Sequence, residues 1–269
     1  LLRGAPRPKA CVEDEPDPAL LPSPRSLPAS GTAHHNPGGY GPLAKIFYIN
    51  LDRATDRRAS IERQLNTSGV PYERFEAVDA KDVKAGKYSG AMRRLSAGVA
   101  DSKKGRWASI AATLSHRLLY EHILKHEPAG NRTFMVLEDD AVLVPDWQAR
   151  LRELLPTLPP GASSIFCGQW GDIRCSDVIS EGPEGLALAT LPAWRTGPPE
   201  RFYYLGATSV LLFPSSLSAL LSQLQHQQIE EGDINLLSGG SVYTYAMLQP
   251  LAHPGNFGSM RRDLNDALA

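Results

Sequence analysis

The sequence predicts an α/β protein whose central, mostly parallel sheet is flanked by helices. The first ordered segment, IFYINL at 46–51, is rich in β-branched and aromatic residues and therefore predicts a strand. A helical pattern at 55–66 and a second strand pattern at 72–78 follow it. A strand, a helix and another strand in this order are typical of a parallel α/β sheet.

Further elements continue this alternation. Ile61 and Leu65, four residues apart, share one face of the first predicted helix, and Gly69 is a common helix stop. A longer helix is expected from Ala108 to His126, where apolar residues recur at steps of four. Other strands are predicted at 133–137, 164–167, 186–191, 205–213 and 241–251, and other helices at 215–227 and from an Asp146 cap to about Leu155.

A change in composition near residue 43 predicts a domain boundary. Nine prolines occur up to Pro42, without apolar periodicity, which is typical of an extended or disordered segment. We therefore predict a disordered tail or stem at 1–43 and one folded domain at 44–269. Within that domain, residues 81–104 are polar and rich in Gly, Ser and Lys, so they are expected to form a mobile loop.

The overall composition narrows the classes of function. The chain has 269 residues, of which 42% are hydrophobic and 21% charged, as in an ordinary soluble globular protein. A formal net charge of −1 argues against nucleic acid or an anionic membrane as a partner. No apolar stretch approaches the ~20 residues that span a bilayer. Because the sequence begins at Leu1, a removed signal or membrane anchor stays open.

The three cysteines, Cys11, Cys167 and Cys175, show no CxxC spacing, so a zinc site is not expected. Cys167 and Cys175 either close a short loop in an oxidising compartment or remain buried thiols. The second interpretation is preferred.

The segment FMVLEDDAVL at 134–143 is the most informative stretch of the chain. Four apolar residues lead directly into Glu138, Asp139 and Asp140, as where a buried strand ends at the edge of a sheet. Three adjacent carboxylates repel one another, and a nearby cation relieves that repulsion. Because oxygen ligands suit magnesium, manganese and calcium, a divalent metal is the natural candidate. The alternative is a solvated acidic turn without a function.

Three blocks together carry a family resemblance. They are YINLDR at 48–53 with DRR at 56–58, YERFEAVD at 72–79, and LSH at 114–116 followed by VLEDDAVL at 136–143. In this order and spacing they resemble glycosyltransferase family 25, which includes bacterial lipooligosaccharide galactosyltransferases and animal procollagen galactosyltransferases. The resemblance covers about residues 45–155, and a weaker likeness extends from Tyr204 to Pro250.

The resemblance implies a single α/β domain of the GT-A type that binds a sugar nucleotide. It also implies an inverting transfer of a hexose, usually galactose, from a UDP-sugar to an acceptor hydroxyl, with manganese in many members. By similarity to the DxD motif of GT-A enzymes, Asp140 is the expected primary metal ligand. Glu138 is its partner or holds the donor ribose, because residues two apart on an extended strand end project to one side. Asp139 points away toward backbone or a loop, or contacts the donor sugar.

The end of the first strand is the expected nucleotide site. Ligands of open α/β sheets bind beyond the carboxyl ends of the strands, and family members place the nucleotide there. Asn50 and Leu51 lie at this position. Arg53 or Arg57 is expected to meet a phosphate, and Asp79 to meet the uracil or ribose. The alternatives are surface ion pairs for Arg57 and a helix or turn cap for Asp79.

An inverting transfer needs a base that takes the proton of the attacking hydroxyl. Asp233, which resembles the aspartate of the family's Pro-x-Asp region, is the first candidate, and Asp172 is the second. Helix capping is the alternative role for Asp233. By likeness to the C-terminal histidine of some GT-A enzymes, His253 is a candidate for completing the metal shell. His116 is expected to be a buried structural histidine, with ordering of the site as its alternative role.

The sequence therefore predicts a UDP-hexose-dependent glycosyltransferase whose partners are the UDP-sugar donor and a glycan, glycolipid or protein acceptor. One departure supports a rival. The Gly-Cys pair and the acidic residue that usually precede the LSH block correspond here to Ala111, Ala112 and Ser109. The alternative is thus a catalytically inactive relative that acts as a binding or chaperone module. A phosphoryl or nucleotidyl transferase is disfavoured, because no P-loop or kinase-like glycine pattern occurs. The stem suggests the secretory lumen for a eukaryotic protein, whereas a bacterial one acts in the cytoplasm.

Overall fold

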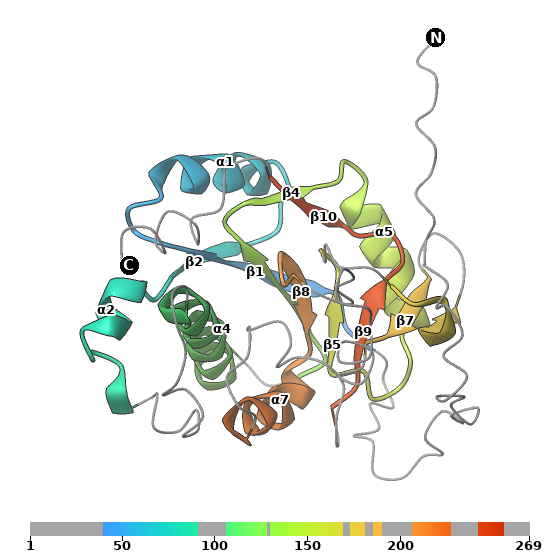
Figure 1. Cartoon of the computed structure of the whole chain (residues 1–269). Helices are drawn as coiled ribbons and strands as arrows, with labels where there is room; N and C mark the ends of the chain where they lie inside the picture. Colours follow the sequence, from blue (N-terminus) through green and yellow to red (C-terminus); the bar gives the residue numbers. More distant parts are fainter. Residues whose placement is uncertain are drawn as a thin grey trace.

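The computed structural model describes residues 40–90, 106–127, 130–168, 173–180, 185–189, 206–226 and 242–255. These segments form an α/β fold (Figure 1). The strands are β1 (Leu43–Asn50), β2 (Tyr72–Glu76), β3 (Thr133–Glu138), β4 (Ala141–Leu143), β5 (Ser164–Phe166), β6 (Val178–Ser180), β7 (Leu186–Leu188), β8 (Ser209–Leu212), β9 (Thr244–Met247) and β10 (Ala252–Pro254). The helices are α1 (Thr55–Asn66), α2 (Ala80–Lys84), α4 (Arg106–His126), α5 (Trp147–Leu154) and α7 (Pro214–His226), with 3₁₀ turns η2 (Leu155–Thr157) and η3 (Cys175–Asp177).

Among the described residues, eight strands form the main sheet in the order β2-β1-β3-β8-β5-β9-β7-β6. β1 pairs in parallel with β2 and β3, and β5 pairs in parallel with β9. β8 and β7 are antiparallel to their neighbours. The strands β2, β1, β3, β5, β9 and β6 therefore run in one direction, and β8 and β7 in the other. The predicted α/β fold with a central, mostly parallel sheet flanked by helices is confirmed.

Alternating side chains of β1 supply two hydrophobic cores, one on each face of the sheet. Ile46 and Tyr48 pack with residues of α1 and α5, whereas Phe47 and Ile49 pack with residues of α4 and α7. Figure 1 shows these two pairs of helices on opposite sides of the sheet. Because both faces are covered, β1 and β3 are apolar along most of their length, as is typical of buried parallel strands.

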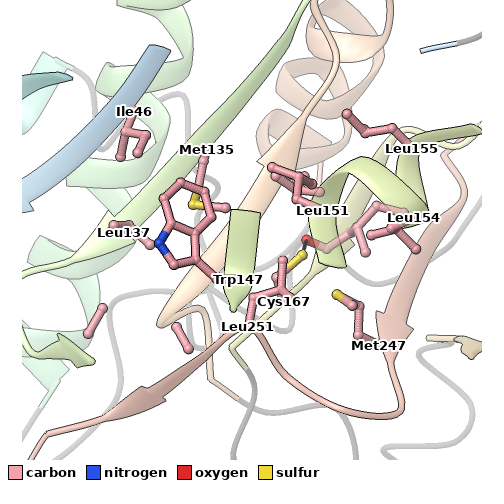
Figure 2. Packing of buried hydrophobic residues seen from close by; sticks show 14 of the residues in the cluster. Ile46, Met135, Leu137, Trp147, Leu151, Leu154, Leu155, Cys167, Met247 and Leu251 are labelled. Carbon is pink, nitrogen blue, oxygen red and sulfur yellow. Dashed lines mark hydrogen bonds between the residues drawn. The ribbon is translucent and has the colours of Figure 1, made fainter. Parts of the chain in front are cut away.

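Figure 2 shows the core between the sheet and α5. Trp147, Leu151 and Leu154, three or four residues apart on one face of the helix, share a buried cluster with Met135 and Leu137 of β3. This packing holds the segment that follows the acidic residues against the sheet.

The cysteines differ from one another. Cys167 is buried in the core of Figure 2 and keeps its thiol, so the short loop between Cys167 and Cys175 is not closed. Cys175, however, is disulfide-bonded, so the preferred interpretation of buried thiols holds for Cys167 and is wrong for Cys175.

Helices and strands with a clear periodicity fall close to their predicted positions. α1 has the predicted bounds, Thr55–Asn66, and α4 begins two residues before the predicted Ala108. The predicted Asp146 cap is wrong, because this residue precedes α5 but its side chain makes no capping hydrogen bond. The strands β4, β6 and β10 were not predicted, although the equally short β5 and β7 were.

The segment 81–104 does not begin as a loop. α2 starts at Ala80, and its buried residues Ala80 and Val83 pack against α4. The two apolar positions bury enough surface to hold this short helix in place. Residues 91–105 lie outside the described part of the chain, so the rest of that prediction is not addressed.

Only the last residues of the predicted tail belong to the described structure. There the hydroxyl of Tyr40 donates hydrogen bonds to the carbonyl oxygens of Pro159 and Ala162, at 2.9 and 3.2 Å. Tyr40 is therefore already part of the fold. Among the helices in the described ranges, none has both the length and the apolar character that a membrane span needs.

We expect Leu154→Ala to lower the free energy of unfolding by about 2–5 kcal/mol, because it opens a cavity in the core between β3 and α5. Leu154 is fully buried, whereas Leu124 is 45% exposed on α4. The matched control Leu124→Ala should therefore change stability by only about 0.5 kcal/mol. Urea denaturation measures both variants, and equal losses would contradict the packing described here.

Candidate active site

The acidic residues lie where the parallel strands β1 and β3 end side by side. Ile49 of β1 pairs with Glu138 of β3, and Asn50 pairs with Glu76 of β2. The chain leaves the sheet at this edge in two places, through the loop from β1 to α1 and through the acidic turn from β3 to β4. Ligand sites of open α/β sheets form at such an edge, as the sequence predicts.

Asn50 is the centre of a buried hydrogen-bond network at this edge. Its side-chain nitrogen donates to the carbonyl oxygen of Ala54 at 3.1 Å and to Oδ2 of Asp139 at 2.8 Å. Its side-chain oxygen accepts from Nε of Arg58 at 3.2 Å and from Nε of Arg74 at 3.1 Å. These four bonds use both donor hydrogens and both lone pairs of the amide. Asn50 thereby links β1, β2, α1 and the acidic turn.

Arg57 supplies the positive charge next to the acidic turn. Its guanidinium donates to Oδ1 of Asp139 at 2.9 Å and to Oδ2 of Asp140 at 3.4 Å, and only 12% of the side chain is exposed. Asp139 therefore has one oxygen bonded to Asn50 and the other to Arg57. A buried carboxylate is stable only with such partners. Of the adjacent arginines Arg57 and Arg58, Arg57 is the one that contacts Asp139 and Asp140.

Asp140 is less well satisfied than Asp139. Its Oδ1 atom is buried and makes no hydrogen bond with the part of the chain that the structure describes. Burial, and next the charge of Glu138, raise the pKa of the carboxyl to about 6, although Arg57 acts in the opposite direction. The backbone nitrogen of Gly255, just after β10, donates to the carbonyl oxygen of Asp140 at 2.7 Å. An unsatisfied carboxylate oxygen at a ligand-binding edge is suited to a cation.

The surroundings of Glu138 differ from those of both Asp139 and Asp140. Its backbone nitrogen donates to the carbonyl oxygen of Thr208 at 3.0 Å, and its side chain is 35% exposed. Its Oε1 atom lies 3.6 Å from Nε2 of His116 on α4. The geometric reason for grouping Glu138 with Asp140 was wrong: β3 ends at Glu138, and Asp139 and Asp140 form a turn rather than an extended strand end. The two carboxylates are nevertheless near enough that the charge of Glu138 acts on Asp140.

The remaining nucleotide-site candidates surround the loop from β1 to α1. Arg53 forms an ion pair with Asp79, and Asp79 also caps α2 by accepting a hydrogen bond from the backbone nitrogen of Lys81 at 2.9 Å. The capping alternative for Asp79 is thus present. The carbonyl oxygen of Leu51 accepts from the backbone nitrogen of Ala54 at 2.9 Å and shapes the turn into α1.

Sequence reasoning missed Arg74 and Asp52. The carboxylate of Asp52 accepts from Arg58 at 3.1 Å and from Arg74 at 3.0 Å, and 76% of it is exposed. Arg74 occupies a charged position of the alternating segment 72–78, which is the only signal that sequence offers for it. Arg53, Arg58 and Arg74 therefore place three guanidinium groups around the ends of β1 and β2.

Several predicted site residues are not brought together. His253 is exposed on β10, which pairs with β4 so that His253 lies opposite Val142. Within the described ranges, no three His, Cys, Asp or Glu side chains form a group that could hold a metal ion. The predicted three-ligand set of Glu138, Asp140 and His253 is therefore not formed. Asp172 and Asp233 lie outside the described residues.

Comparison with known proteins identifies the segment that contains this site. Residues 43–173 match the model of the family described as Glycosyltransferase family 25 (LPS biosynthesis protein). Residues 43–173 belong to glycosyltransferase family 25. The resemblance carried by the three blocks is therefore confirmed. The family 25 segment contains Asn50, Arg57 and all three acidic residues, whereas His253 lies outside it.

Two curated relatives match somewhat more than half of the chain. The "Putative glycosyltransferase R655" of Acanthamoeba polyphaga mimivirus is 30% identical over 168 residues, which are 60% of this chain and 47% of the relative. A "Glycosyltransferase 25 family member" of Anopheles gambiae is 31% identical over 160 residues, which are 58% of this chain and 26% of the relative. The match thus spans about half of the first relative and about a quarter of the second.

A solved structure also matches weakly. Mouse xyloside xylosyltransferase 1, in its apo form, is 14% identical, with 71% of this chain and 66% of that chain covered and a TM-score of 0.33. A score this low supports no conclusion about the fold or the function of the present protein.

We expect Asp140→Asn to stabilise the protein above pH 6 when no divalent metal is added. The folded state holds the pKa of this carboxyl above its ordinary value of 3.8, at about 6. Its stabilising contribution is therefore fully present below about pH 4 and is lost as the pH rises through about 6. The variant should gain roughly 2–3 kcal/mol at pH 8, and the gain should shrink toward pH 4.

Urea denaturation across this pH range measures the gain. Asp146→Asn is the matched control, because Asp146 is exposed and its side chain makes no capping bond. A lower stability of Asp140→Asn at pH 8 would contradict the electrostatic strain inferred for this residue.

Proposed function

We propose that the protein is an inverting glycosyltransferase that moves a hexose, galactose in the first instance, from a UDP-sugar to an acceptor hydroxyl with a divalent metal. The observation that carries the proposal is the partly buried carboxylate of Asp140, whose Oδ1 atom has no hydrogen-bond partner. It lies beside Glu138 and Arg57, at the carboxyl end of parallel strands within a family 25 segment.

The residues present fit a divalent metal, with manganese as the expected ion. Hard cations of this kind are often held by one or two carboxylates, with waters and substrate phosphates completing the shell. Asp140 and Glu138 would hold the ion, so the lack of a third protein ligand among the described residues is compatible with this chemistry. A bound metal would act as a Lewis acid and neutralise the charge that develops on the diphosphate.

The arginines at the edge suit the same donor. Arg57 already pairs with Asp139 and Asp140 and would offer its positive charge to a diphosphate bound there. A guanidinium makes planar, bidentate contacts with phosphate oxygens. Arg53 and Asp79, paired at the ends of β1 and β2, would border the uracil and ribose. Asp139, with both oxygens already bonded to Asn50 and Arg57, would act by holding Arg57 in place.

The acceptor side rests on residues outside the described part of the chain. Asp233 stays our first candidate for the base that takes the acceptor proton, and Asp172 the second. We propose a glycan, a glycolipid or a protein hydroxyl as the acceptor. A membrane anchor on a preceding segment, and with it a luminal location, stays part of the proposal for a eukaryotic source.

Asp140→Asn should abolish turnover of the donor. The amide removes the charge that would hold the metal, while the fold is kept. UDP release from a panel of UDP-sugars with manganese measures this, with Asp146→Asn as an active control of the same chemical change. Chelation by EDTA should also stop the reaction of the parent protein. Full activity of Asp140→Asn would refute the metal role of this residue.

One observation favours a second candidate, a catalytically inactive binding module. Arg57 already offsets the charge of Asp139 and Asp140, and the described residues form no three-ligand group. Calorimetric titration of UDP with and without manganese separates the candidates. An inactive module should show no metal-dependent binding and no UDP-sugar hydrolysis, whereas the proposed enzyme should bind UDP more tightly with manganese and release UDP from its donor.

A further inference from the structure

Two adjacent residues of α4, Ser115 and His116, lie against the loop after β2 and against the end of β3, at the edge that carries the site. The hydroxyl of Ser115 accepts a hydrogen bond from the backbone nitrogen of Val78 at 2.8 Å and donates to the carbonyl oxygen of Ala111 at 2.7 Å. Val78 directly precedes Asp79, the partner of Arg53. Ser115 therefore ties α4 to the part of the site that follows β2.

His116 lies next to Glu138, the last residue of β3. Its Nε2 atom lies 3.6 Å from Oε1 of Glu138, and its side chain is 7% exposed. At this distance the contact is slightly longer than a hydrogen bond, and the side chain of Glu138 is 35% exposed. Hydrogen bonds of this kind are often long in ligand-free proteins and shorten when the ligand binds.

Tyr120, one turn further along α4, lies behind His116. Its hydroxyl is 3.4 Å from Nδ1 of His116, and the residue is fully buried. Burial, and then the charge of Glu138, raise the pKa of Tyr120, so the hydroxyl keeps its proton. The tautomer of His116 decides which group donates: when the hydroxyl donates to Nδ1, the ring proton lies on Nε2, which is the nitrogen that faces Glu138.

We propose that His116, held by Tyr120, is a positioning residue that orients the carboxylate of Glu138 toward Asp140 so that the two receive the divalent cation. The inference rests on the proposed function, because it assigns His116 to the metal step of that reaction. Residues that orient a metal ligand through a histidine N–H commonly change metal affinity or activity roughly 10- to 100-fold when they are removed. A purely structural histidine, the role expected from sequence, would affect folding instead.

The contact itself is tested without any ligand. In the full chain labelled with ¹⁵N-histidine, the His116 ring should be protonated on Nε2 at neutral pH, with its signal assigned by its loss in His116→Gln. Glu138→Gln should shift the Nε2 resonance, and Tyr120→Phe should allow the other tautomer to appear. A ring protonated on Nδ1 that does not respond to Glu138→Gln would overturn the inference.

The positioning role is tested by manganese binding, measured by calorimetry in the presence of UDP. His116→Phe removes both ring nitrogens and should weaken manganese binding by roughly 10- to 100-fold. His116→Gln keeps an N–H donor close to the position of Nε2 and should restore most of the affinity. Thr113→Val is the control on the same helix, because the buried Thr113 hydroxyl makes no hydrogen bond.

Thermal unfolding accompanies each titration, so that a loss of folding is recognised. If the parent protein binds no manganese with UDP, the proposed function fails, and the positioning role fails with it. If the parent binds manganese, and the folded variants His116→Gln and His116→Phe both bind it as tightly as the parent does, the positioning role alone is refuted. If His116→Phe does not fold, His116→Gln and Tyr120→Phe decide the question, since near-parental binding is expected for the first and weaker binding for the second.

Discussion

The buried contact of Asp139 with Asn50 and Arg57 is the interaction on which the rest of the site depends. It joins the end of β1 and the start of α1 to the turn after β3. A carboxylate removed from water is costly unless both of its oxygens are bonded, and here one oxygen meets a neutral amide and the other a guanidinium. Loss of Arg57 would leave the buried charge without compensation, and loss of Asn50 would leave one carboxylate oxygen without its hydrogen bond. This contact therefore fixes where the acidic turn lies relative to the arginines around it.

Because both oxygens of Asp139 are bonded to Asn50 and Arg57, the three adjacent acidic residues differ in their surroundings. Asp139 holds the turn to β1 and α1, whereas Asp140 has one oxygen without a hydrogen bond to the described residues and a carboxyl with a raised pKa. Glu138 faces α4 and solvent. Electrostatic strain of this kind is common at functional sites, because it is relieved by the ligand rather than by the protein. A cation bound at this turn, as proposed above, would relieve the strain at Asp140.

Segments distant in sequence close the site. β10 pairs with β4, and the backbone of Gly255 bonds to that of Asp140. α4 reaches the same edge from the other face of the sheet through Ser115 and His116. The family 25 match covers most of these groups but ends before β10. The edge is thus one unit in space, although it is assembled from the first and the last described parts of the chain.

Local patterns were sufficient for much of the fold and for the position of the acidic residues at the edge of the sheet. The bounds of α1, the strands β1 and β3, and the acidic residues at the end of β3 follow from periodicity and from short apolar runs, which depend only on neighbours in sequence. The three blocks were sufficient for the family. Tertiary structure alone decided the partner of each carboxylate, because these contacts join distant residues: Asn50 meets Asp139 across 89 positions and Arg57 meets it across 82. It also decided the three-residue strands β4 and β10, whose hydrogen bonds come from pairing and not from intrinsic preference.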